Sequence, residues 1–302
     1  MSSFKDLRIV DNFYQTSAFF PMPTIIVGTV SENGTTNLGA YSLCFPYYVA
    51  GKDFYAMILE SRNSSNTAQN ILRGSKVSLN FITDDKKFFK EAVRLGFPGE
   101  TTEEKMKNCI FTLENGLADG IRPKIVKEAY QVFECTWDSE LENAYKNKAG
   151  RLEGYDPPYR NFNGITSKFG AHFILKIDKI LMKEKYYNSI INGVKAKDFP
   201  SVPVDYGYRD STNFWCSPFK KPFPEKIQVK EGDINSVKYA AKRINPEVTF
   251  TDESCAKLTK IPRIFLKAAL TQMVEIAKEE GFKVIDEKEL QIINDKRRKE
   301  KK

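Results

Sequence analysis

Residues 54–67, FYAMILESRNSSNT, join an apolar run to a cluster of hydroxyl and amide side chains. The first half, Phe54 to Glu60, has the composition of a buried strand, and a second strand is expected at Val77 to Phe81. Hydroxyls, one guanidinium and unpaired backbone N–H groups before a helix favour a bound phosphate or similar anion. The same cluster can also be a plain N-cap, with Ser65 or Asn66 as the capping residue.

A strand pair upstream supports the ligand interpretation. The β-branched run Thr24 to Val30 is followed by the turn Asn33-Gly34 and by a return strand, Asn37 to Cys44. Small side chains let a flat ligand approach a strand backbone closely. The return strand contains three of them: Gly39, Ala40 and Ser42.

The order of predicted elements indicates a mainly β fold, an antiparallel β-barrel with α insertions. No G-x-G-x-x-G opens a helix after the first strand, so a Rossmann fold is not expected. Beyond the strands already given, two more are expected at Tyr130 to Trp137 and His172 to Met182. The helical insertions are expected at Thr67 to Arg73, Lys86 to Leu95 and Thr102 to Lys107.

A change in composition after Pro224 divides the chain into a barrel domain, residues 1–224, and a small helical C-terminal domain, residues 225–302. Two turn-rich segments, residues 143–170 and 186–224, are expected to be long functional or interfacial loops. Aromatic side chains in the second segment could stack on a planar ring or form a subunit contact.

Within the helical domain, Pro262 and Gly281 mark the ends of one helix. Asp286 and Glu289 predict a capping box for the last helix. We expect the apolar face of the first of these helices to bury itself against the barrel, a neighbouring subunit or a partner. That face consists of Phe265, Leu266, Ala269, Leu270, Met273, Ile276 and Ala277.

Cysteine and histidine usage excludes several kinds of site. The five cysteines are scattered without a C-x-x-C pair, so no zinc ribbon, iron–sulfur cluster or other metal site is expected. Cys44 is either a core residue, which we favour, or a reactive thiol beside the ligand. His172 is the only histidine, so at most one imidazole is available for acid–base chemistry.

Charge and hydropathy limit the partners. Residues 296–302 carry six positive charges and one negative charge, which leaves +3 of the net +8 for the other 295 residues. We therefore expect no nucleic-acid partner, and a basic end that binds nucleic acid or protein is the least favoured alternative. No apolar run approaches the roughly 20 residues that span a bilayer. The start, Met1 to Asn12, does not resemble a signal peptide, so we expect no membrane partner and a cytoplasmic location.

Several motifs occur in an order typical of one family. They are Pro21 to Val27, Asn33-Gly34, Asn37 to Ser42, Thr67 with Asn70-Ile71, and Gly170 to Leu175. On these residues the chain, over roughly residues 13–183, resembles the flavin reductase-like, flavoredoxin-type FMN-binding family.

The resemblance implies an FMN-binding split barrel, a homodimer, and FMN as cofactor with NAD(P)H as the expected co-substrate. It implies that five residues hold the FMN phosphate: Arg62, Ser64, Ser65, Asn66 and Thr67. Ser61 is a further candidate contact. It implies that a second group runs along the isoalloxazine: Asn37, Leu38, Gly39, Ala40, Tyr41, Ser42 and Leu43. His172 is the candidate catalytic residue, or else a strand histidine bonded to backbone.

The expected function is an FMN-dependent oxidoreductase that passes electrons from a reduced nicotinamide to an acceptor, either a small molecule or a redox protein. The alternative is a flavoredoxin-like carrier whose partner is another protein's redox centre. Flavin chemistry needs few catalytic side chains, because the ring itself takes the electrons. Insertions at residues 86–120 and 186–224 are expected to shape the substrate side.

Overall fold

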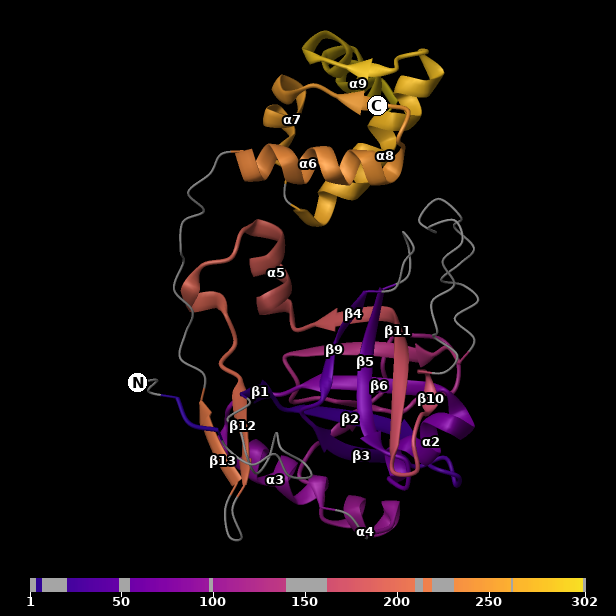
Figure 1. The fold of residues 1–302 in the computed structure, drawn as a ribbon, viewed down its shortest axis with the longest axis vertical. Helices are drawn as coiled ribbons and strands as arrows, with labels where there is room; N and C mark the ends of the chain where they lie inside the picture. Colours follow the sequence, from indigo (N-terminus) through magenta and orange to yellow (C-terminus); the bar gives the residue numbers. More distant parts are fainter. Residues whose placement is uncertain are drawn as a thin grey trace. The chain divides into compact units, whose positions relative to one another are not determined.

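The computed structural model describes residues 4–6, 21–48, 55–97, 100–139, 162–209, 214–218, 231–261 and 263–300 (Figure 1). The chain divides into two compact units, residues 1–187 with 197–221, and residues 188–196 with 222–302. The boundary at residue 224 stays a prediction, since the units divide at residue 221 and the second also takes in residues 188–196. We describe each unit by itself.

An eight-stranded sheet, paired throughout in antiparallel fashion, forms the first unit. Its order is β3-β2-β6-β9-β11-β5-β4, with the short β10 beside β11. The bounds are β2 Ile25–Val30, β3 Thr36–Tyr41, β4 Cys44–Tyr48, β5 Tyr55–Arg62, β6 Lys76–Phe81, β9 Gln131–Trp137, β10 Gly164–Ile165 and β11 Gly170–Met182. These strands confirm a mainly β first unit.

One predicted strand is wrong in a way that matters for the fold. The return strand expected at Asn37 to Cys44 is two strands, because β3 ends at Tyr41 and β4 begins at Cys44. These two strands are the two ends of the sheet order, yet only two residues join them. Two residues span on the order of 10 Å, so the sheet must curl until its edges approach each other.

Helices cover both faces of this sheet, as strand alternation allows. On one face, α2 (Asn66–Gly74) packs Ala68 and Ile71 into a core with Val27, Leu59 and Phe173. On the other, α3 (Lys86–Gly96) adds Ala92 and Leu95 to a second core, while Met106 of α4 (Thr102–Lys107) packs at its margin. All three predicted insertions are therefore present, within one residue at each end.

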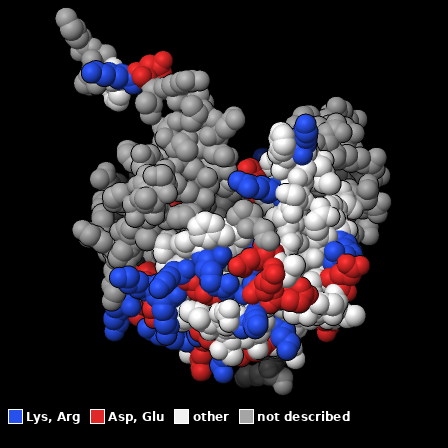
Figure 2. Space-filling view, turned by 90° about the horizontal axis from the view of Figure 1, so that it is seen from below, with Lys and Arg blue, Asp and Glu red and all other residues white. Residues whose placement is uncertain are grey.

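Charges of both signs lie on the face seen from below in Figure 2. Arg94 of α3 forms ion pairs with Glu91, at 2.6 Å, and with Glu100, at 3.8 Å. Burial opposes ionisation of Glu91, but the bonds and charge of Arg94 outweigh it and hold the Glu91 pKa below its usual value. This ion pair fixes α3 beside α4, because Arg94 also donates to the carbonyl of Lys105.

The long loop expected over residues 186–224 is partly wrong. The structure places α5 (Glu184–Asn192), a 3-10 turn (Ala196–Asp198), β12 (Pro203–Arg209) and β13 (Phe214–Pro218) there. β12 pairs with both β13 and β1 (Met22–Pro23). Gly and Pro made the segment look like loop, but pairing with a strand about 180 residues away stabilises it. Of the second loop, expected at 143–170, residues 143–161 lie outside the described residues. A separate two-stranded sheet consists of β7 (Leu113–Glu114) and β8 (Ile125–Val126).

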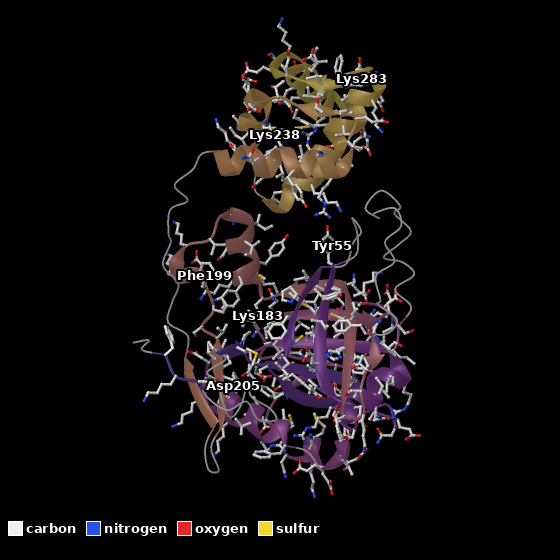
Figure 3. All side chains as sticks on the ribbon, viewed as in Figure 1. Tyr55, Lys183, Phe199, Asp205, Lys238 and Lys283 are labelled. Carbon is white, nitrogen blue, oxygen red and sulfur yellow. The ribbon has the colours of Figure 1, made fainter. Side chains whose placement is uncertain are left out.

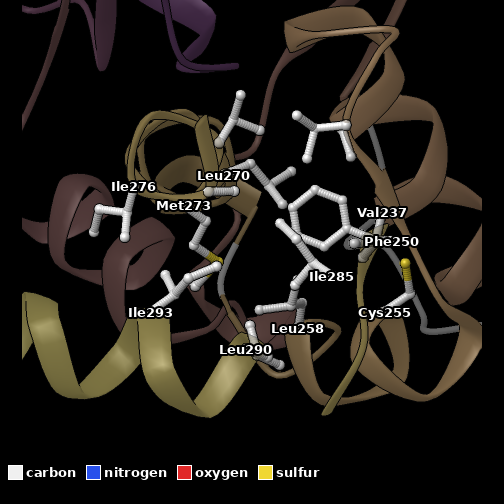
Figure 4. Packing of buried hydrophobic residues seen from close by; sticks show 14 residues of the cluster. Val237, Phe250, Cys255, Leu258, Leu270, Met273, Ile276, Ile285, Leu290 and Ile293 are labelled. Carbon is white, nitrogen blue, oxygen red and sulfur yellow. The ribbon is translucent and has the colours of Figure 1, made fainter. Parts of the chain in front are cut away.

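The second unit is helical and has its own core (Figure 4). It contains α6 (Glu231–Ile244), α7 (Asp252–Leu258), α8 (Arg263–Glu279) and α9 (Glu287–Glu300), with β14 (Thr249–Phe250) parallel to β15 (Val284–Ile285). Leu270 and Met273 of α8 pack against Phe250 and Ile293. The apolar face of α8 is thus buried within its own unit, so the expectation that it packs against the barrel, a neighbouring subunit or a partner is wrong.

Of two sequence predictions for α8 and α9, one is confirmed and one is wrong. The capping box is confirmed, since Asp286 and Glu289 each accept from the other's backbone N–H at 3.3 Å. Phe265 is wrongly assigned to the buried face, because 46% of it is exposed. A periodic pattern defines a stripe, and residues at the margin of a stripe can remain in solvent. Pro262 lies outside the described residues.

We predict that Leu270→Ala destabilises the helical unit by about 2–5 kcal/mol, because it removes a fully buried side chain and leaves a cavity. Chemical denaturation followed by helical circular dichroism measures this. Phe265→Ala, on the same helix, is the control and should cost less than about 1 kcal/mol. Equal losses in both variants would contradict the assigned core.

Candidate functional site

The site begins where β5 ends. β5 pairs with β11 as far as its last residues, so that Ser61 lies opposite Ala171 and Arg62 lies opposite Gly170. Both residues therefore belong to the strand, and the loop expected from Ser61 onward is shorter than predicted. Asn63 fixes the loop, because its backbone N–H donates to Phe169 at 3.0 Å and its side chain donates to Lys168 at 2.8 Å.

Ser65 is the N-cap of α2, which confirms the capping interpretation for this residue. Its Oγ accepts from the backbone N–H of Ala68 at 3.1 Å. Asn66 donates from its side chain to the carbonyl of Glu100 at 3.0 Å. These two side chains hold the start of the helix in place, so each has a structural role whatever the loop binds.

Other polar groups at the same place are not used by the fold. Within the part of the chain that the structure describes, the side chains of Arg62 and Ser64 form no hydrogen bond or ion pair, and both are exposed. The Ser61 Oγ is buried and likewise lacks a hydrogen-bond partner. A buried hydroxyl without a partner costs about 1–3 kcal/mol, which a ligand could recover. A guanidinium, two hydroxyls and a helix N-terminus together suit a phosphate group.

The predicted ring strand and the predicted phosphate loop are adjacent. A Cβ on Gly39 would lie 3.0 Å from Thr67 Oγ1 and 3.0 Å from Tyr41 Cε2, so only glycine fits without a shift of these neighbours. The Tyr41 hydroxyl donates to Ser65 Oγ at 3.4 Å. The structure thus brings Gly39, Tyr41, Ser65 and Thr67 together from two separate stretches of sequence.

A hollow of about 450 Å³, counted with the open space at its mouth, lies at the end of β3. β3 is the last strand in the sheet order, so one of its edges has no sheet partner among the described strands and can offer backbone hydrogen bonds to a ligand. The space beside Gly96 is open, since a Cβ there would meet only Ala40 Cβ, in ordinary contact at 3.9 Å. The lining residues are Thr24, Ala40, Tyr41, Ser42, Phe89, Ala92, Val93, Gly96 and Asp205.

Asp205 and the residues of α3 in this lining were not predicted from the sequence. Asp205 belongs to β12, is 7% exposed and is labelled in Figure 3. The insertion at residues 86–120 was expected to shape the substrate side, and its helix α3 does line the hollow. No local signal distinguishes Asp205 from other aspartates, because only the pairing of β12 with β1 brings it here.

Asn37 and Leu38 do not offer their side chains to a ligand. Asn37 is 1% exposed, accepts from Thr102 Oγ1 at 3.1 Å and donates to Thr29 Oγ1 at 3.4 Å. Leu38 is fully buried in the core beneath α3. Only their backbone groups could contact a cofactor, and Leu43 already accepts from the backbone N–H of Glu60 at 2.9 Å.

His172 is oriented by side chains rather than by backbone. Its Nδ1 lies 2.6 Å from Thr166 Oγ1, its Nε2 lies 3.6 Å from Glu60 Oε1, and Phe162 stacks on the ring with centroids 5.0 Å apart. His172 pairs with Glu60 and the preceding residue pairs with Ser61, so His172 and Ser61 point to opposite faces of the sheet. The structure does not turn the imidazole toward the loop hydroxyls, and its catalytic role stays a prediction.

Cys44 is a core residue. It is buried against Leu59 and Met57, and this burial raises the pKa of its thiol to about 12. Cys135, which packs in the same core, has its pKa raised for the same reason. Thiolate chemistry beside the ligand strand is thereby disfavoured. Among the described residues, no cluster of histidine, cysteine and carboxylate side chains could hold a metal ion, and no helix is long and apolar enough to cross a membrane.

No family model matches the chain, and no curated protein matches it. Among solved structures it is similar to flavoredoxin from Methanosarcina acetivorans, with 15% identity, a TM-score of 0.48, and coverage of 76% of this chain and 99% of that one. Flavoredoxin of Desulfovibrio vulgaris (Miyazaki F) has 12% identity, a TM-score of 0.49, and coverage of 74% and 98%. The styrene monooxygenase flavin reductase from Pseudomonas putida S12 has 9% identity, a TM-score of 0.44, and coverage of 69% and 99%. These are the kinds of protein that the sequence motifs resemble.

We predict that Cys44 in the native protein reacts with iodoacetamide at pH 8 at least about 100-fold more slowly than in urea. With its pKa raised by burial, the thiol stays protonated at this pH, and the thiolate is the nucleophile. Peptide mass spectrometry after timed alkylation measures the rate at this residue. Alkylation at the unfolded rate would restore the reactive-thiol alternative.

Proposed function

We propose that this protein is an FMN-dependent oxidoreductase of the flavin reductase type, which takes electrons from NAD(P)H and passes them to an acceptor. The single observation that carries the proposal is a set of polar side chains around the start of α2 that have no partner among the described residues, those of Ser61, Arg62 and Ser64. They adjoin a strand edge that opens onto a hollow, and this combination suits a ligand with a phosphate at one end and a planar ring at the other.

The residues present fit such a cofactor. Arg62, Ser64 and the buried Ser61 hydroxyl would hold the phosphate, while the free edge of β3 at Ala40 to Ser42 would hydrogen-bond the ring. Bound FMN would accept and release electrons itself. The chain would supply position and exclude water, with the apolar side chains Phe89 and Val93 of α3 as one wall of the hollow.

A second candidate function is that of an FMN-bound electron carrier, and one observation favours it. The β10–β11 hairpin, which Asn63 holds against the loop, exposes Ile165 (58%) and Phe169 (74%). Exposed apolar side chains beside a cofactor suit transient contact with a redox protein. As part of the same proposal, the protein is a homodimer located in the cytoplasm.

One experiment separates the candidates. Purified protein mixed with FMN should become yellow, and anaerobic stopped flow with NADH or NADPH should bleach the bound flavin rapidly. Bleaching by dithionite but by neither nicotinamide would indicate the carrier. Protein that takes up no FMN would end both proposals.

We predict that Arg62→Ala weakens FMN binding by about 10- to 100-fold, since hydrogen bonds to charged groups contribute about 1.5–3 kcal/mol. Riboflavin, which lacks the phosphate, should bind the variant as it binds the wild type. Titration of flavin fluorescence measures both. The control is Arg73→Ala at the other end of α2, where Arg73 donates to Asn70 at 3.1 Å, and it should leave FMN affinity unchanged.

We also predict that Gly96→Leu weakens FMN and riboflavin equally, by at least about tenfold, because the new side chain fills the hollow beside Ala40. The matched control is Gly74→Leu, since a Cβ on Gly74 meets no atom within 4 Å. Both are measured by the same titration. Unaltered flavin binding by Gly96→Leu would place the ring elsewhere.

A further inference from the structure

Tyr41 borders both halves of the proposed site. Its backbone lies at the end of β3 and lines the hollow, while its ring packs against the core beneath α2. Its hydroxyl reaches the start of α2, where it donates to Ser65 Oγ at 3.4 Å. Gly39 leaves room for this reach, because a Cβ there would lie 3.0 Å from the Tyr41 ring and the ring would have to shift.

The bonds of Ser65 determine what its hydroxyl can still do. A serine hydroxyl donates once and accepts twice. The N–H of Ala68, at 3.1 Å, and the O–H of Tyr41, at 3.4 Å, occupy both accepting positions. The remaining capacity of Ser65 is a single O–H donor.

Thr67 extends the arrangement. Its hydroxyl lowers the pKa of the Tyr41 phenol, and Thr67 itself is buried. Burial raises the pKa of Tyr41 by more than the two hydroxyls lower it, so the phenol stays protonated at neutral pH and keeps its proton to donate. Hydroxyls linked in a chain polarise one another and strengthen the terminal donor.

We propose that Tyr41 is a positioning residue that makes Ser65 an obligate hydrogen-bond donor and thereby selects phosphorylated flavin over riboflavin. A phosphate monoester offers only acceptors, so a group restricted to donation suits it. A cap whose hydroxyl could still accept would show less preference. The inference rests on the proposed function, because it assigns a role at the same site.

The test measures the dissociation constants of FMN and riboflavin for wild type and Tyr41→Phe. Phenylalanine keeps the ring and removes the donor, so we expect FMN to bind about five- to tenfold more weakly and riboflavin to bind unchanged. Tyr130→Phe is the matched control: Tyr130 is also a partly buried tyrosine, whose ring contacts Tyr186 and Phe81, and its loss of a hydroxyl should alter neither constant.

The Ser65→Asp variant keeps the helix cap and removes the hydroxyl donor. Aspartate is a good N-cap but accepts only and carries negative charge. We expect the melting temperature to be retained and FMN binding to fall at least about tenfold. In a Ser65→Ala background, Tyr41→Phe should have no further effect on FMN affinity, because the Ser65 hydroxyl through which Tyr41 acts on the ligand is absent.

Each outcome has one meaning. Wild type that binds neither flavin contradicts the proposed function. Wild type that prefers FMN, with the same preference in Tyr41→Phe, leaves the proposed function intact and overturns the role of Tyr41. An equal loss of both flavins in Tyr41→Phe, or an additive double variant, also overturns it, since it would show a purely structural effect.

Discussion

The close approach of α2 to β3 at Gly39 is the contact on which the rest of the first unit depends. Because position 39 has no side chain, Thr67 and the Tyr41 ring can occupy the space over the strand. The helix then closes one face of the curled sheet with Ala68 and Ile71. A larger residue at this position would separate the helix from the strand and, with it, the two halves of the candidate site.

Polar side chains at this junction serve the fold and the proposed chemistry at once. Ser65 caps the start of the helix and has only a donor left over, whereas the side chains of Arg62 and Ser64 form no hydrogen bond or ion pair among the described residues. The buried hydroxyl of Ser61, which has no partner among the described residues, lowers the stability of the fold. Native proteins tolerate such costs mainly where function uses them.

The two edges of the sheet approach each other because only two residues join Tyr41 to Cys44. This turn places the end of β3 under α3, and the contribution of Asp205 from β12 completes the lining of the hollow. The helical unit needs none of these contacts for its own core, in which α8 packs among α6, α7 and α9. The burial of its apolar stripe therefore does not call for a partner.

Local patterns determined the elements whose stabilising contacts are close in sequence. The Asn33-Gly34 hairpin, the helix at Lys86, the Ser65 cap and the Asp286 capping box all follow from residues within a few positions of one another. Only the tertiary structure decided that β3 ends at Tyr41, that His172 points away from Ser61, and that Asp205 joins the hollow. Those outcomes depend on strand register and on pairing across more than a hundred residues, and neither leaves a periodic trace in the sequence.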